Sequence, residues 1–183
     1  ANLKNDTAAE IWILPLADDS GSMVAAKGSI KIASQASETG VISLYLAGTR
    51  VQLTVLATDT PAQIAAALTA AIAKKTDLPV TAAVKSDATD TIELTAKNAG
   101  LLGNGIDIRL NYLGTQGGEV TPAGLTLTVT AMTGGAGAPD FVDALGNLQD
   151  KTFDFIINPY DDTASLDAMK VSLNDAYGRW AWD

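Results

Sequence analysis

The chain has 183 residues and a net charge of −9; 47% of its residues are hydrophobic and 18% are charged. This composition can bury a real core and excludes a disordered chain, while the acidic charge argues against nucleic acid as a partner. The sequence has no cysteine and no histidine, which excludes a disulfide framework, a thiolate nucleophile and the commonest general base and metal ligand.

The first predicted element is a short apolar run at residues 10–19, EIWILPLADD, which stops at Pro15 and an Asp pair. It predicts a buried strand followed by a loop. No apolar run approaches the roughly 20 residues that span a bilayer, and residues 1–10 show no signal-peptide pattern. We therefore expect no membrane partner.

Residues 23–134 read as a β-rich block with one helix. In GVISLYLAG and TRVQLTVLA apolar residues recur at every second position, and Ala47-Gly48 between the two runs predicts a hairpin turn. Further strands are predicted at residues 28–34, 78–84, 91–97, 105–112 and 124–132.

Residues 58–76 are the clearest helix. Thr60 is the expected N-cap, Pro61 takes the first helical position and Gln63 completes a capping box. Apolar residues then recur every fourth position and predict one buried stripe: Ile64, Leu68 and Ile72.

After GGAGAPD at 134–140 the pattern changes to a helix at 139–148, a buried strand at 152–160 and a long helix at 163–180. Asp161, Asp162 and Thr163 are candidate caps for the last helix. One face of that helix is apolar: Leu166, Met169, Leu173, Tyr177 and Trp180. The simplest account inserts residues 23–134 into an α/β domain formed by 1–22 and 135–183, with IWILPL and FDFIINPY in one mostly parallel sheet.

The glycine-rich GGAGAPD stretch raises the possibility of a phosphate-binding loop. It lacks the Lys-Ser/Thr pair of a P-loop and the third glycine of the dinucleotide fingerprint. Pro139 suits the first position of a helix, so we interpret the stretch as the return joint from the inserted block, with a boundary near residue 135. A second glycine cluster, GLLGNGID at 100–107, is predicted to be a loop between strands.

Two acidic pairs, Asp18-Asp19 and Asp161-Asp162, follow the two predicted core strands. These carboxylates could together hold a hard cation, but no EF-hand spacing is present, so we interpret them as loop solvation and helix caps. An enzyme with a carboxylate-held metal is one alternative. No histidine is available to activate a serine, so a hydrolase is not expected. We assign no catalytic, cofactor-binding or metal residue and expect no cofactor.

Several segments, taken in order, resemble the contractile tail sheath proteins of Mu-like bacteriophages. These are IWILPLADD, GVISLYLAGTRVQLTVLATDTPAQIAAALTAAIAKKTDLPVTA, LTAKNAGLLGNGIDIRLNY, GGAGAPDF and FDFIINPYDDTASLDAMKVSLNDAYGRW. The resemblance covers essentially the whole chain. Ala138 departs from the Asn we would expect there, which implies a weaker cap by about 1 kcal/mol.

The resemblance implies an α/β core of subtilisin-like topology without a working triad, carrying an inserted, outward-facing β-rich α+β domain. It implies a structural, non-enzymatic subunit of the virion, assembled in the host cytoplasm. Its partners would be neighbouring sheath subunits in hexameric rings and a helical stack, the tail tube and the baseplate. Contraction would drive the tube through the host envelope by a shift between two packings.

Sheath proteins extend beyond both ends of this sequence, so we expect a stable, protease-resistant fragment that lacks the terminal arms and is monomeric. In such a fragment the aromatic end of the last helix would form an exposed apolar patch. The main alternative function is a β-rich adhesin or glycan-binding module. That function needs exposed aromatic side chains, and the block offers two, Tyr45 and Tyr112.

Overall fold

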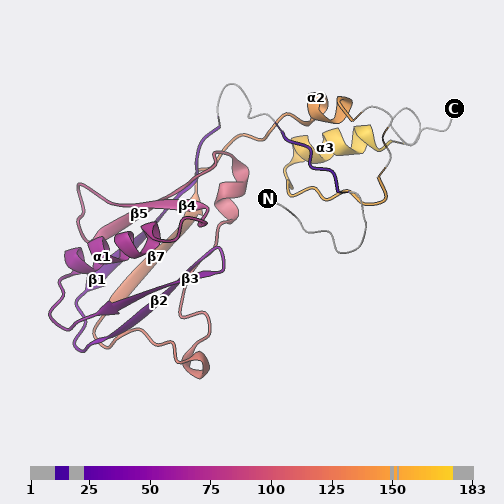
Figure 1. Ribbon diagram of the computed structural model, residues 1–183. Coiled ribbons are helices and arrows are strands. Elements are labelled where there is room, and N and C mark those ends of the chain that lie inside the picture. Colours follow the sequence, from indigo (N-terminus) through magenta and orange to yellow (C-terminus); the bar gives the residue numbers. More distant parts are fainter. Residues whose placement is uncertain (1–10, 17–22, 149–150, 152, 175–183) are drawn as a thin grey trace. The chain divides into compact units, whose positions relative to one another are not determined.

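The computed structural model describes residues 11–16, 23–148, 151 and 153–174. The protein is α+β, with two antiparallel sheets and three helices in the described chain (Figure 1). It divides into two compact units. We call Ser20–Gly137 the β unit, and Ala1–Asp19 with Ala138–Asp183 the helical unit.

The β unit contains two sheets. The first has the order β4-β5-β1-β7 and the second β3-β2-β6, and all neighbouring strands are antiparallel. The bounds of the strands are β1 Lys27–Ser34, β2 Gly40–Leu46, β3 Thr49–Val55, β4 Val80–Val84, β5 Thr91–Ala96, β6 Ile108–Leu110 and β7 Thr126–Thr133.

The hairpin predicted around Ala47-Gly48 is confirmed. These two residues join β2 to β3 with φ angles of 48° and 78°. Two positive φ angles in a two-residue loop are typical of a type I′ turn, whose twist suits antiparallel strands.

Helix α1, Pro61–Ala73, is confirmed with its capping box. The Thr60 side chain accepts a hydrogen bond from the Gln63 N–H, and the Gln63 side chain accepts one from the Thr60 N–H at 2.9 Å. The helix packs on strands of both sheets, namely β1, β3, β4 and β5. Its buried side chains are those of the predicted stripe together with Ala65.

One hydrophobic core lies between α1 and the sheets. Its largest fully buried members in the strands and α1 are Ile30, Ile32, Ile42, Leu44, Leu46, Ile64, Leu68, Ile72, Ile92, Leu94 and Met132. These residues are branched or flexible aliphatics, so the β unit builds its core with few aromatic rings.

The helical unit differs from its prediction. Helix α2 is Phe141–Gly146 and helix α3 is Thr163–Ser172, but residues 11–16 and 153–160 form no strand in the described chain. The mostly parallel sheet is therefore absent from the part that the structure describes. An apolar run becomes a strand only where another strand pairs its backbone, which its own sequence does not specify.

Two helix boundaries also differ from the prediction. The N-cap of α2 is Asp140, whose carboxylate accepts from the Val142 N–H at 2.8 Å, so neither a cap at Ala138 nor a start at Pro139 is correct. Helix α3 begins after its Asp162 cap as predicted but ends at Ser172 rather than near residue 180. Tyr177 and Trp180 lie outside the described residues.

Candidate functional site

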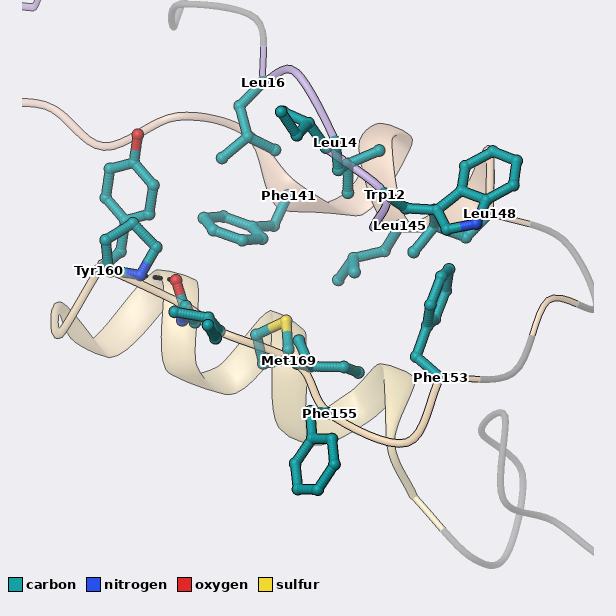
Figure 2. Close-up of a pocket in the computed structure, with 15 residues that line it drawn as sticks. Trp12, Leu14, Leu16, Phe141, Leu145, Leu148, Phe153, Phe155, Tyr160 and Met169 are labelled. Carbon is teal, nitrogen blue, oxygen red and sulfur yellow. Dashed lines mark hydrogen bonds between the residues drawn. The ribbon is translucent and has the colours of Figure 1, made fainter. Parts of the chain in front are cut away.

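The helical unit contains an apolar cavity of about 460 Å³ (Figure 2). Four segments enclose it: residues 12–16, helix α2 with its C-terminal turn, residues 153–160, and α3. The lining residues are Trp12, Ile13, Leu14, Leu16, Phe141, Leu145, Leu148, Phe153, Phe155, Ile156, Ile157, Asn158, Pro159, Tyr160 and Met169. The two runs predicted as core strands thus meet at one apolar site.

Aromatic contacts and caps hold this site together. Phe141 packs edge-on against Tyr160 with ring centroids 5.4 Å apart, and the Lys151 ammonium lies 3.8 Å from the centre of the Trp12 ring. At the start of α3, the Asp162 carboxylate accepts from both the N–H and the hydroxyl of buried Ser165. The Ser165 hydroxyl is the main cause of the lowered pKa of Asp162.

Much of the apolar surface beside the cavity is exposed. Phe155 is 91% exposed, Ile157 93% and Ile13 72%. In Figure 2, Phe141 and Met169 point toward the cavity, while the ring of Phe155 points away from it. Large apolar side chains grouped on an exposed surface mark sites where a protein packs against something else.

The acidic pairs do not come together as a described site. Asp18 and Asp19 lie outside the described residues, Asp161 is exposed and Asp162 caps α3. In the described part of the chain no cluster of three or more acidic, His or Cys side chains could hold a metal ion. Nor is any described helix long and apolar enough to cross a membrane.

The two glycine clusters form one structure, which we call the clasp. The side chain of Asn104 donates to the Gly135 carbonyl at 2.9 Å and accepts from the Gly135 N–H at 2.8 Å. Val24 and Ala136 exchange both backbone hydrogen bonds, at 2.9 and 3.1 Å, and Leu101 donates to the Gly137 carbonyl. The clasp therefore binds residues 23–24 and 100–104 to residues 135–137.

Close backbone contacts explain the glycines of the clasp. A side chain at Gly135 would place its Cβ 2.5 Å from the Gly100 carbonyl oxygen. Gly100 and Gly137 have positive φ, and a Cβ at either would meet Met23 at less than 3.0 Å. These glycines allow three chain segments to cross within contact distance.

The β unit also contains a buried ionic cluster that the sequence pattern does not predict. The Glu119 carboxylate is fully buried, accepts from the Tyr45 hydroxyl at 2.6 Å and the Leu113 N–H at 2.9 Å, and lies 2.9 Å from Arg50 Nε. The Arg50 contact is an ion pair and not a hydrogen bond, because the N–H is not directed at the carboxylate. Arg50 also donates to the Ser43 hydroxyl.

The cluster sets the charge of Glu119. Burial would raise its pKa, but hydrogen bonds from Tyr45 and Leu113 and the charge of Arg50 together lower it. The hydrogen bond to Glu119 in turn raises the pKa of Tyr45. The only sequence signal was the pairing position of Tyr45 opposite Arg50 in the hairpin, which does not identify a glutamate 74 residues away.

The two tyrosines considered for glycan binding are not equivalent. Tyr45 is 8% exposed and is engaged by Glu119, whereas Tyr112 is 62% exposed, with the Arg109 guanidinium 5.6 Å from its ring centre. The rings of the two tyrosines are tilted against each other at 5.5 Å. One exposed ring does not make a sugar-stacking platform, so this alternative is not favoured.

Comparison with known proteins places the chain. No family profile matches it. It is 37% identical over 174 residues to a protein of Haemophilus influenzae named "Mu-like prophage FluMu tail sheath protein", and the match covers 95% of this chain but 34% of that protein. The chain thus spans about a third of the length of this relative, and the predicted kinship with the tail sheath proteins of Mu-like phages is confirmed.

Proposed function

We propose that this chain is part of a contractile tail sheath subunit, a structural and non-enzymatic component of a phage virion. The observation that carries the proposal is the 37% identity across 95% of the chain. The apolar surface of the helical unit supports it, because a protein that works by packing against other protein needs such a surface.

In the proposed assembly, subunits form hexameric rings in a helical stack around the tail tube and above a baseplate. Contraction is a change between two packings of the same subunits that drives the tube through the host envelope. The subunits assemble in the host cytoplasm before they become part of the virion.

We further propose two discontinuous domains. Residues 1–22 and 135–183 belong to an α/β core of subtilisin-like topology, and residues 23–134 are an inserted β-rich domain that faces outward. The separation into two compact units is compatible with this division. The runs at 11–16 and 153–160, which form no strand within the described residues, would become strands when the remainder of the longer protein supplies neighbouring strands.

Electron microscopy of the full-length protein tests the function. We expect tubes or striated sleeves whose width and length change on triggering. A full-length protein that stays a small soluble species under every condition would contradict the proposal. The 183-residue chain alone should sediment as a monomer, because it covers only a third of the related sequence.

The exposed apolar surface can be tested by placing one charge on it. Ile157→Asp in the full-length protein should prevent sleeve formation, because a carboxylate would be buried without a partner. Val41→Asp is the matched control, since Val41 is an exposed apolar residue in β2 of the β unit. Normal sleeves from Ile157→Asp would show that this surface is not buried in the assembly.

A further inference from the structure

We propose that Asn104 is a site of spontaneous deamidation that the clasp protects, and that the modification releases the clasp. The starting observation is that Asn104 is the only asparagine in the sequence followed by glycine. Glycine lacks a Cβ, so its backbone nitrogen can attack the preceding side chain with little hindrance. This inference does not depend on the sheath proposal.

The reaction needs no enzyme or cofactor. The backbone nitrogen of Gly105 attacks Cγ of Asn104, the Cγ–Nδ2 bond breaks, and ammonia leaves with the proton lost by the backbone nitrogen. Water then opens the resulting five-membered imide to aspartate or isoaspartate. Asn104 and Gly105 both lie on the exposed side of the 3-10 helix Leu101–Gly105, so water has access to them.

Hydrogen bonding rather than burial therefore provides the protection. The amide group of Asn104 is held at both ends by the buried backbone of Gly135. Attack by Gly105 requires the side chain to leave this position and present Cγ to its own following nitrogen. The rate in the folded protein should follow the fraction of time for which the clasp is open.

The product would not fit the clasp. An aspartate at 104 still accepts from the Gly135 N–H but cannot donate to the Gly135 carbonyl, and its second oxygen would face that carbonyl. An isoaspartate would in addition lengthen the backbone beside Gly103, where even a Cβ would lie 2.9 Å from Ala26. Modification therefore opens the clasp, where the first described and the last residues of the β unit, 23–24 and 135–137, are bonded to each other.

The test incubates the complete 183-residue chain in mildly alkaline buffer, folded and in urea, and follows the one-dalton mass increase by peptide mapping. We expect Asn104 to deamidate at least about tenfold more slowly in the folded chain, because the clasp must first open locally. Equal rates in the two conditions would overturn the proposal.

Two glycine variants separate the clasp from the intrinsic chemistry. Gly135→Ala places a methyl group against the Gly100 carbonyl and should speed deamidation of the folded chain. Gly105→Ala meets no atom within 4 Å, so it should leave the clasp closed while slowing the reaction in urea. A folded Gly135→Ala chain with the wild-type rate would contradict the protective role.

The release step has its own measurement. Asn104→Asp should speed hydrogen exchange at the backbone N–H groups of Gly135 and Leu101. Exchange at the backbone N–H groups of helix α1 should stay unchanged. If Gly135→Ala does not fold, this variant and the wild-type comparison in urea still decide the matter. Unchanged exchange at both positions would show that the modification does not open the clasp.

Discussion

The β unit and the helical unit use apolar residues in opposite ways. In the β unit, leucine and isoleucine side chains of strands and helix α1 are fully buried in one core. In the helical unit, Phe155 and Ile157 are more than 90% exposed and the apolar runs at 11–16 and 153–160 lack strand partners in the described chain. The β unit therefore buries its apolar side chains in its own core, while the helical unit presents an apolar surface suited to further packing.

The largest expected effect lies in the core of the β unit. Leu68→Ala removes a fully buried side chain from α1 and should lower the free energy of unfolding by about 3 kcal/mol. Far-UV circular dichroism during urea unfolding measures it, and Ala67→Ser at an exposed position of the same helix is the control. All three tryptophans belong to the helical unit. An equal shift of the urea midpoint measured by tryptophan fluorescence would therefore show that the two units do not unfold independently.

The second effect is a dependence of β-unit stability on pH. Because the pKa of Glu119 is lowered in the folded state, its contribution is present above the ordinary value of 4.5 and is lost as the pH falls through the folded value. Glu119→Gln should be less stable than wild type at neutral pH, and the difference should shrink in acid.

Thermal melts of both chains between neutral and acid pH measure this difference. Glu93→Gln serves as the control, because Glu93 pairs with exposed Lys27 at the surface of β1 and β5. A gap between wild type and Glu119→Gln that stays constant with pH would show that the buried carboxylate does not couple to folding.

The third effect concerns the cap of α1. Thr60→Ala removes the side-chain acceptor for the Gln63 N–H and should cost about 1 kcal/mol. Thr60→Ser keeps the hydroxyl and should cost less. Equal losses for the two variants would mean that the methyl group of threonine, and not the capping bond, is what matters.

The smallest effect is expected in the helical unit. Phe155→Ala should change the free energy of unfolding of this chain by less than about 0.5 kcal/mol, because the ring is almost fully exposed. The same substitution in the full-length protein should cost far more if the ring is buried there. Urea unfolding followed by tryptophan fluorescence measures the change in this chain. A loss above about 2 kcal/mol, the cost typical of a core residue, would show that Phe155 is already packed in the helical unit.

Local signals were enough to predict much of the β unit. The capping box around Thr60 and the Ala47-Gly48 turn depend on residues within a few positions of each other, and both were correct. The alternation of apolar residues also located the longer strands. The 105–112 run was less well predicted, since only Ile108–Leu110 pairs with β2 and the glycines before it form a 3-10 helix.

What could not be predicted depends on partners far away in the sequence. Neither the burial of Glu119 beneath Tyr45 nor the bonding of Asn104 to Gly135 has a local pattern. The runs at 11–16 and 153–160 have strand composition, but their backbone groups need a neighbour that composition does not supply. The similarity to a longer sheath protein could be predicted because several segments along the whole chain occur in the same order as in that family.

The backbone pair formed by Val24 and Ala136 has a practical consequence. Two residues that exchange both hydrogen bonds across antiparallel segments have Cα atoms about 5.5 Å apart, which is within the span of a disulfide. Since the chain has no cysteine of its own, Val24→Cys with Ala136→Cys would give a single, unambiguous crosslink. Oxidation would link the two ends of the β unit and close a loop of roughly 110 residues. Chain entropy predicts that this raises the free energy of unfolding by about 4.7 kcal/mol. Adding a reductant would break the crosslink, so the same chain could be compared with residues 24 and 136 joined and with them free.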